Sequence, residues 1–316
     1  MTLLVRLPNW VGDVCMALPA LRGLSGQGLA LRLLGRPWAA DLLAGHPWPV
    51  DGLPAGVRAA AAAVRACGID RGLLFPNSFS SAWTFRLGGV RAIGYRGDGR
   101  SLLLARAVAR PGGAHEVESF WALACEAARW LDRPPLPPAP PARLGLQPAP
   151  AHRQQARDAL AAAGVETGES APPVVVLAPL ATGTILGVSK VWPHFAALSR
   201  HLADGGARPV CCPGPNEARS AAEAVPEAVQ LPGLRLGAYA AVCAQAALVV
   251  ANDSGPMHLA AAVDAPVLGV FGTGDPGRTR PWSPGAQWIG GPPSGWPSLQ
   301  AVCSRVDRML TERRVG

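Results

Sequence analysis

The chain has 316 residues and a mass of 32.6 kDa, which is enough for two domains that each bury a core. Its apolar runs end well before the roughly 18 residues of a membrane span, and its seven cysteines include no CxxC pair, so we expect no transmembrane helix, zinc site or disulfide framework. The net charge of +8 indicates an anionic partner, and the scattered arginines make nucleic acid the weakest candidate.

The first half alternates strands and helices from its N-terminus. The expected elements are a strand at Leu3–Leu7, a helix at about Asp13–Leu24, a strand at about Ala30–Leu34 and a strand at Gly72–Phe75. Asn77 or Ser78 can cap the helix that follows the last of these strands. Arg6 and Asp13 interrupt the apolar N-terminus, so we expect no signal peptide and a cytoplasmic protein. The order strand, helix, strand predicts a parallel sheet.

A proline-rich linker at residues 134–150 ends this half, because proline removes a backbone donor and fixes φ. We therefore predict an N-terminal domain at 1–145 and a C-terminal domain at 151–316. The second half is expected to contain strands at Val174–Leu177, Pro209–Cys212, Leu248–Ala251 and Val267–Phe271, and helices at Arg153–Ala163, Pro193–Leu202, Glu217–Ala224, Ala238–Ala246, Pro256–Val263 and about Leu299–Arg313.

This pattern predicts an α/β fold of two doubly wound parallel-sheet domains. In such a fold the two domains face a central cleft, and a ligand lies at the carboxyl ends of the strands. The last helix, at about 299–313, could pack back on the first domain.

The segment Ala251–His258 directly follows one of the predicted strands. A strand that ends in capping residues and then enters a helix presents backbone N–H groups, which favours a diphosphate. Ser254 and Gly255 lie at this turn. The alternative is that Asp253 or Ser254 only caps the helix and that His258 is a buried histidine with its hydrogen bonds satisfied.

Lys190 is the only lysine among 29 basic residues. A strand leads into a flexible Gly/Thr/Ser loop that contains Thr182 and Thr184, and Pro193 opens the next helix at a position that tolerates proline. Hydroxyls, amides and one ammonium group can hold a diphosphate without a divalent metal. The alternatives to a diphosphate site are that the loop is only solvated and that the lone lysine results from codon bias.

Residues 8–13 (PNWVGD) lie between the first strand and its helix. Gly12 lets the backbone come close to a ligand. Asp13 is the only carboxylate among the first 40 residues, and it is either a general base or a helix cap.

A GxGxxG sequence at 272–277 follows a predicted strand and suggests a nicotinamide cofactor. Pro276, Pro281 and Pro284 prevent the long helix that such a site requires. We therefore interpret Gly272–Arg280 as a tight loop that lines the cleft.

Together these residues resemble glycosyltransferase family 9, the bacterial heptosyltransferases of the lipopolysaccharide inner core, and most of all its second-heptose branch. The matching stretches keep the family's order through both halves: LPNWVGDVCMALPALRGL (7–24), FPNSFSSAWTFRLGGVRAIGYRGDGRSLLL (75–104), HEVESFWALA (115–124), SKVWPHFAALSRHL (189–202) and ANDSGPMHLAAAVDAPVLGVFGTGDPGRTRPWSP (251–284). The resemblance implies a GT-B architecture of two Rossmann-like domains. It also implies metal-independent, inverting heptose transfer from ADP-heptose without a cofactor.

The resemblance further implies roles for individual residues. The family's catalytic aspartate corresponds to Asp13 and its diphosphate-binding lysine to Lys190. Further donor contacts correspond to Thr182, Thr184, Leu234, Glu217, Asp253, Ser254, Gly255 and His258. The assignment of the two threonines is approximate, because the loop is longer than in the first-heptose branch. The family's acidic ribose contact corresponds to Asn216-Glu217, where the register of the match is ambiguous.

The implied partners are ADP-heptose or a related nucleotide sugar and an anionic glycolipid acceptor. Candidate acceptor contacts are Asn9, Trp10, Arg86, Arg91, Arg96 and Arg100, the last four near Tyr95. We expect a monomer that binds no nucleic acid and can associate with the cytoplasmic face of the inner membrane. Three alternatives stay open: a GT-B glycosyltransferase with another nucleotide sugar or acceptor, a sugar-nucleotide-binding protein without turnover, and a nonhydrolysing nucleotide-sugar epimerase.

Overall fold

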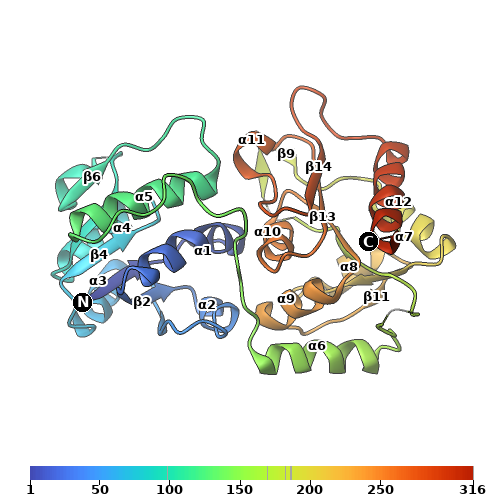
Figure 1. The fold of residues 1–316 in the computed structure, drawn as a ribbon, viewed down its shortest axis with the longest axis horizontal. Helices are drawn as coiled ribbons and strands as arrows, with labels where there is room; N and C mark the ends of the chain where they lie inside the picture. Colours follow the sequence, from blue (N-terminus) through green and yellow to red (C-terminus); the bar gives the residue numbers. More distant parts are fainter. Residues whose placement is uncertain (98, 169, 182, 186, 316) are drawn as a thin grey trace. The chain divides into compact units, whose positions relative to one another are not determined.

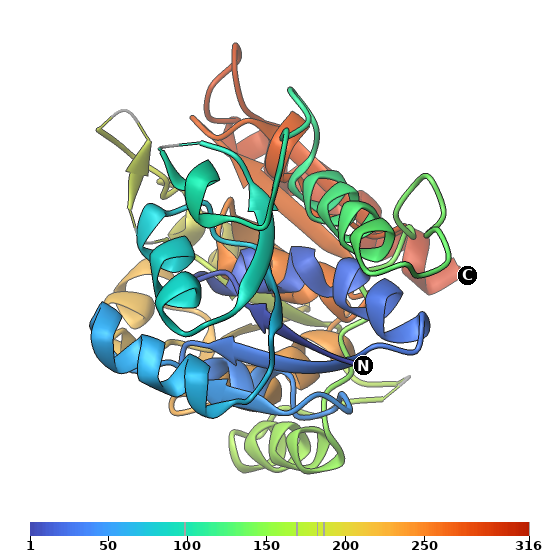
Figure 2. The ribbon, with the colours of Figure 1, turned by 90° about the vertical axis from the view of Figure 1, so that its left-hand side faces the viewer.

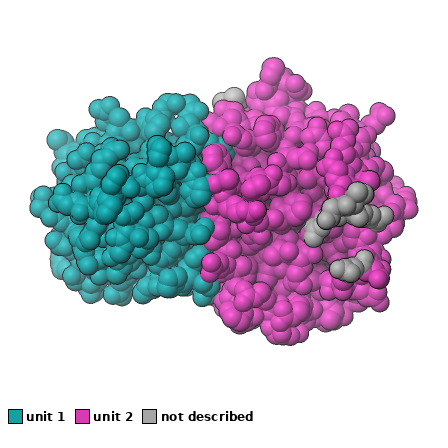
Figure 3. All heavy atoms as spheres, in the orientation of Figure 1, with its two compact units in different colours: residues 1–141 teal, residues 142–316 magenta. Residues whose placement is uncertain are grey.

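The computed structural model describes residues 1–97, 99–168, 170–181, 183–185 and 187–315. The chain divides into two compact units, unit 1 at Met1–Pro141 and unit 2 at Ala142–Gly316 (Figure 3). This boundary falls within the predicted proline-rich linker. From 131 to 149, where every residue is described, the chain forms no helix or strand.

Unit 1 contains a six-stranded parallel sheet with the order β3-β2-β1-β4-β5-β6 (Figure 1). Its strands are β1 (Thr2–Arg6), β2 (Ala30–Gly35), β3 (Val50–Gly52), β4 (Arg71–Leu74), β5 (Arg91–Tyr95) and β6 (Arg106–Val108). In the central strand β1, Leu3, Leu4 and Val5 are all fully buried. Such a continuous apolar run is typical of a parallel strand that is covered on both faces.

The helices of unit 1 cover both faces of the sheet. They are α1 (Val11–Gly26), α2 (Trp38–Leu42), α3 (Val57–Ala66), α4 (Phe79–Leu87), the 3₁₀ helix η1 (Arg100–Leu103) and α5 (Glu116–Trp130). Helix α1 packs against α5, and α3 packs against α4 on the other face (Figure 2). Ser78 is the N-cap of α4 and accepts a hydrogen bond from the N–H of Ser81, which confirms one of the two predicted caps.

Unit 2 repeats this strand order in a second parallel sheet, β11-β10-β7-β12-β13-β14. Its strands are β7 (Val174–Ala178), β10 (Arg208–Cys211), β11 (Val229–Gln230), β12 (Leu248–Asn252), β13 (Val267–Phe271) and β14 (Ala286–Gly290). Every residue of β7, β12 and β13 is buried. Both sheets have the strand order of the Rossmann fold, which confirms the predicted α/β class with two doubly wound parallel sheets.

The helices of unit 2 are α6 (Pro150–Ala162), α7 (Phe195–Asp204), α8 (Ala218–Ala224), α9 (Leu236–Gln245), α10 (Gly255–Ala262), α11 (Pro276–Thr279) and α12 (Leu299–Val315). Helix α12 packs against α7 and β12 and buries Val302, Val306 and Met309 in the core of this unit. Across the described residues, no helix combines the length and the apolar character that crossing a bilayer requires.

Several predicted segments of unit 2 differ from the structure, helices α6 and α9 by up to three residues at their starts. Helix α7 begins at Phe195, so the expected start at Pro193 is wrong, because a hydrogen bond from the Trp192 N–H to β12 holds the chain in front of the helix. The segment 272–280, expected to be only a loop, includes the short helix α11. Asp275 caps α11 by accepting a hydrogen bond from the Gly277 N–H.

Candidate functional site

Each sheet has a topological switch point, where the strand order reverses. It lies between β1 and β4 in unit 1 and between β7 and β12 in unit 2. Ligands of doubly wound sheets bind at the carboxyl ends of these strands. Asp13 follows β1, Lys190 follows β7 and Asp253 follows β12. In the part of the chain that the structure describes, no three His, Cys, Asp or Glu side chains gather as a metal ion would require.

In unit 2, Lys190 and Asp253 form an ion pair, with 3.0 Å between Nζ and Oδ2. Their side chains are 21% and 9% exposed, so the pair is largely shielded from water. Asp253 also accepts a hydrogen bond from the hydroxyl of Thr279 in α11 at 3.2 Å. Gly274 lies so close that a Cβ at this position would be 2.3 Å from the Asp253 carboxylate. The segments after β7, β12 and β13 therefore meet at one carboxylate.

Asn252, the last residue of β12, anchors the segment that carries Lys190. Its buried side chain donates from Nδ2 to the Pro179 carbonyl at 2.7 Å, and its Oδ1 accepts from the Trp192 N–H at 2.9 Å. Both ends of the segment 179–192 are thus tied to β12, which limits the positions that Lys190 can take. Asn252 was not a predicted site residue, although a polar residue at the end of an apolar strand is a signal that could have revealed it.

The predicted flexible loop before Lys190 contains a two-stranded antiparallel hairpin, β8 (Thr184–Ile185) and β9 (Val188–Ser189). β-branched residues favour extended strands, and Gly187, with φ of 78°, supplies the left-handed turn. Thr184 is exposed and pairs with Ser189, the neighbour of Lys190. Thr182 lies outside the described residues.

The turn after β12 enters α10, with Ser254 at the N-cap position and Gly255 as the first helical residue. The side chain of Ser254 does not cap the helix, because its hydroxyl donates to the Asn252 carbonyl at 3.2 Å. The capping alternative is therefore wrong for this side chain. His258 is 4% exposed, which agrees only with the burial that its alternative expected. The donor contacts of Ser254, Gly255 and His258 stay predictions.

Glu217 lies in the turn after β10, where its Oε2 accepts a hydrogen bond from the Gly214 N–H at 2.9 Å. Asn216, with φ of 68°, adopts the left-handed conformation of this turn. Leu234 is half-buried in front of α9. Glu217 as a ribose contact and Leu234 as an adenine contact stay predictions.

In unit 1, Asp13 is a half-buried residue of the first turn of α1. Trp10 is the N-cap residue of this helix, so the alternative that Asp13 is its N-cap is wrong. A first-turn carboxylate interacts favourably with the helix dipole. Trp10 is 69% exposed, and the neighbouring Asn9 is exposed as well.

Arg6, at the end of β1, holds the turn in front of α1. Its Nη2 donates to Oδ1 of Asn9 at 2.7 Å, and its Nη1 donates to the Leu7 carbonyl at 2.6 Å. Burial, together with the charge of Arg36, lowers the pKa of Arg6 to about 10, so the guanidinium stays charged at neutral pH. Arg6 was not a predicted site residue. The charged residue at the end of the apolar run of β1 is the sequence signal that could have revealed it.

The predicted acceptor arginines fall into two groups. Arg86, Arg91 and Arg96 are exposed. Arg100 is fully buried, and its Nη1 donates to the Pro76 carbonyl at 2.6 Å. The expectation that Arg100 contacts an acceptor at the surface is therefore wrong, because this side chain is enclosed in unit 1.

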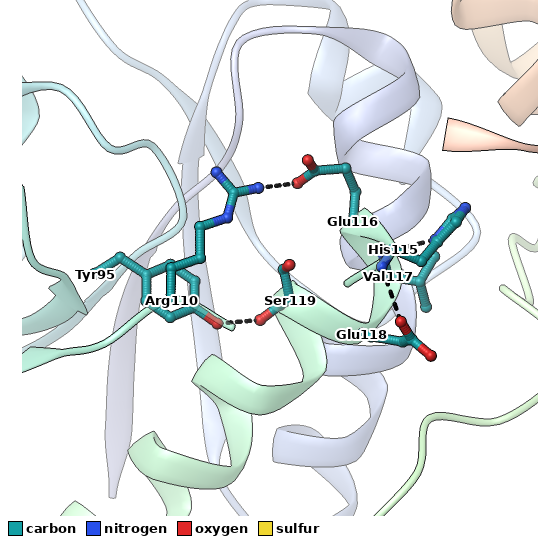
Figure 4. A network of polar contacts seen from close by, with 7 residues as sticks. All are labelled: Tyr95, Arg110, His115, Glu116, Val117, Glu118 and Ser119. Carbon is teal, nitrogen blue, oxygen red and sulfur yellow. Dashed lines mark hydrogen bonds and ion pairs between the residues drawn. The ribbon is translucent and has the colours of Figure 1, made fainter. Parts of the chain in front are cut away.

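Tyr95 belongs to a polar network at the start of α5 (Figure 4). Its hydroxyl donates to the Ser119 carbonyl at 2.5 Å, and Arg110 forms an ion pair with Glu116. His115 caps α5 in a capping box. Burial raises the pKa of Tyr95, so the phenol stays protonated and keeps its donor role at neutral pH. This network joins α5 to the end of β5.

Comparison with known proteins identifies the family. The family model described as "Glycosyltransferase family 9 (heptosyltransferase)" matches residues 57–306, which include Lys190 and Asp253 but not Asp13. The chain belongs to glycosyltransferase family 9. It is therefore a glycosyltransferase, as its motifs predicted.

Relatives within glycosyltransferase family 9 match nearly the whole chain. Lipopolysaccharide heptosyltransferase 2 of Escherichia coli K12 is 27% identical over 92% of this chain and 88% of its own. The protein of the same name from Salmonella typhimurium LT2 is 28% identical over the same shares.

Solved structures of family-9 enzymes have the same fold. The ADP-heptose lipopolysaccharide heptosyltransferase II of E. coli matches with a TM-score of 0.81 and 25% identity over 99% of both chains. An E. coli heptosyltransferase with ADP matches with a TM-score of 0.75 and 23% identity over 98% of this chain and 100% of that one. These matches confirm the predicted GT-B class.

Proposed function

We propose that this family-9 glycosyltransferase transfers heptose from ADP-heptose to the inner core of lipopolysaccharide, with inversion and without a metal ion. The observation that carries the proposal is the Lys190–Asp253 ion pair at the switch point of unit 2, where doubly wound sheets bind nucleotides. Relatives named lipopolysaccharide heptosyltransferase 2 and the similar ADP-heptose enzyme support this donor and this acceptor class.

In this proposal, Lys190 binds the diphosphate of the donor. Its ammonium group already lies at a fixed place, because Asp253 pairs with it and Asn252 ties down the segment around it. Backbone amides at Ser254 and Gly255, at the N-terminus of α10, supply further donors. These groups stabilise the charge that grows on the departing ADP, and one donor of this kind typically contributes roughly 3 kcal/mol.

The remaining donor contacts are proposed from the family pattern. Asp253 and His258 orient hydroxyls of the sugar, Glu217 contacts the ribose, and the backbone at Leu234 faces the adenine. Thr182 and Thr184 lie in the segment that precedes Lys190 and contact phosphate oxygens.

Asp13 is the proposed general base. A sugar hydroxyl has far too high a pKa to attack unaided, so Asp13 accepts its proton as the new glycosidic bond forms. Attack on the face opposite the departing ADP inverts the anomeric carbon. Arg6 is a positioning residue, because it holds the turn in front of α1 through Asn9.

The proposed acceptor is an anionic glycolipid. The exposed Arg86 and Arg96 bind its phosphate or carboxylate groups, and Asn9 and Trp10 contact its sugar. The enzyme acts as a cytoplasmic monomer at the cytoplasmic face of the inner membrane.

Product analysis tests this function. Incubation with ADP-heptose and truncated core glycolipids should add one heptose to the glycolipid and release one ADP, also in excess EDTA. An isomerised sugar nucleotide without a longer glycolipid would indicate an epimerase, and binding without turnover would indicate a non-catalytic protein. Activity that EDTA abolishes and magnesium or manganese restores would refute the metal-free mechanism. Other nucleotide sugars serve as controls for the donor.

A further inference from the structure

Helix α4 of unit 1 exposes a row of large apolar side chains. Phe79, Trp83 and Leu87 are 48%, 40% and 37% exposed. Residues four apart lie on one face of a helix, so these three form a single stripe along α4, hereafter the α4 stripe. Ala82 and Phe85 on the other side of α4 are buried in the core of unit 1. Helix α4 is therefore apolar toward the core and also toward solvent.

A further exposed apolar side chain lies on η1, the element that packs against α4. The rings of Phe79 and Trp83 stack, with their centroids 6.3 Å apart. The 3₁₀ helix η1 packs against α4, and its Leu102 is 93% exposed, whereas Leu103 packs against the same core as α4. A contiguous exposed apolar patch on a protein surface marks an interaction site.

The chain segment that carries these exposed apolar side chains is rich in arginine. Between Arg71 and His115 the sequence has seven arginines and one acidic residue, Asp98, which lies outside the described residues. Four of the seven are buried or lie against carboxylates, namely Arg71, Arg100, Arg106 and Arg110. The other three are Arg86 on α4 and Arg91 and Arg96 at the two ends of β5; all three are exposed, and none forms an ion pair with a described residue.

We propose that the α4 stripe, Leu102, Arg86, Arg91 and Arg96 form the surface with which this protein docks on an anionic lipid bilayer. Tryptophan lies at the level of lipid headgroups, exposed Phe and Leu enter the acyl boundary, and arginine binds headgroup phosphates. A second copy of the chain fits less well, because a two-fold contact would bring like charges together. The docking surface rests on the proposed function in that a glycolipid acceptor lies in such a bilayer.

Co-sedimentation of the full chain with vesicles tests this surface. The wild type should bind phosphatidylcholine vesicles that contain phosphatidylglycerol, bind pure phosphatidylcholine vesicles weakly, and lose binding as salt rises. The double variant F79S/W83S should partition about tenfold less onto the anionic vesicles. Arg86→Gln and Arg91→Gln should each weaken partitioning about fivefold.

Matched variants on unit 2 are the controls. Trp288→Ser removes a tryptophan that is 44% exposed on β14, and Arg308→Gln removes an exposed arginine of α12. Both should bind vesicles like the wild type. Leu102→Ser should weaken binding and cannot disturb the core, which keeps the test valid if the double variant melts at a lower temperature. Wild-type partitioning of Leu102→Ser and the double variant, or a stripe-dependent dimer in sedimentation velocity without vesicle binding, would overturn the proposal.

Turnover on a water-soluble core oligosaccharide separates this proposal from the proposed function. F79S/W83S and Leu102→Ser should keep wild-type turnover on this acceptor, because their side chains act only on the bilayer. If the protein shows no transferase activity but its vesicle binding depends on the α4 stripe, the docking surface is supported and the proposed function is refuted. If the protein shows transferase activity but its vesicle binding does not depend on the α4 stripe, the proposed function is supported and the docking surface is refuted.

Discussion

The two units share one strand order, yet the carboxyl edges of their sheets differ in burial. In unit 2 the charged groups are paired and shielded, with Lys190 and Asp253 at 21% and 9% exposure and Asn252 fully buried. In unit 1 Asp13 is half-buried, and Trp10 is 69% exposed. One sheet topology therefore carries a preorganised charge site in one unit and an open surface in the other.

Loop anchoring explains this difference. In unit 2, Lys190, Thr279 and Gly274 come from separate segments and converge on Asp253. In unit 1, Arg6 turns inward to backbone carbonyls and to Asn9. In the proposed function, a small anionic donor requires fixed, shielded cations, whereas a large lipid acceptor requires an accessible surface. The first three predictions below change one edge at a time.

The largest effect is expected from Asp13→Asn, which keeps the shape of the side chain but cannot accept a proton. Turnover should fall by about 10²-fold or more, while calorimetric affinity for ADP stays unchanged, because the proposed donor site lies in unit 2. Asp70→Asn, an exposed residue of the same unit, is the control. Wild-type turnover of Asp13→Asn would remove this residue from catalysis.

Lys190→Ala should weaken ADP binding roughly tenfold and slow transfer further, because the charge on the leaving group grows in the transition state. Lys190→Arg should rescue only part of the loss, since a planar guanidinium does not fit a place shaped for an ammonium group. Arg200→Ala, an exposed cation of α7, should behave like the wild type. Calorimetry and initial rates measure both effects. Full ADP affinity in Lys190→Ala would mean that the lone lysine is an accident of codon bias.

Asn252→Ala should lower the free energy of unfolding by about 2 kcal/mol, because it leaves the buried Trp192 N–H and Pro179 carbonyl without their side-chain partner. ADP affinity should also fall, since Lys190 loses the anchor of its segment. Asn77→Ala, at an exposed position, controls for the residue type. Urea unfolding and calorimetry measure the two effects. An ADP affinity that does not change would show that the anchor serves stability only.

His46, which lies between α2 and β3 of unit 1, should produce the smallest effect. Burial and the charge of Arg22 lower the pKa of His46 from its usual 6.5 to about 4, and its ring stacks on Trp48. Between these two pH values the unfolded chain binds a proton that the native state does not, so stability falls as pH drops through this window.

The variant His46→Gln removes this proton uptake. Its free energy of unfolding should therefore fall less than that of the wild type between pH 6.5 and pH 4, by about 1 kcal/mol after allowance for partial exposure. His194→Gln, at an exposed position of unit 2, is the control. Parallel pH profiles of wild type and His46→Gln would contradict the assignment.

Much of the fold was predictable because its signals are local. The apolar runs that became β1, β7, β12 and β13 are buried on both faces, and such strands are recognisable as short apolar segments. The sheet-edge strands β3, β6, β11 and β14, the inner strand β5 and the hairpin strands β8 and β9 were not predicted. Of these, β3 and β11 have only three and two residues, and their pairing depends on the neighbouring strand rather than on their own side chains.

The sequence by itself determined that a buried strand, a turn and a helix follow one another around Asp253, and that a single lysine precedes Trp192. Only the tertiary structure decided that Lys190 contacts Asp253, that Asn252 ties down the intervening segment, and that Arg100 is enclosed while Arg86 is exposed. Local patterns encode which elements form and which face of each is apolar. Contacts between strand ends depend on the order and register of strands that are distant in the chain, and these are settled only when the sheets and their covering helices pack together.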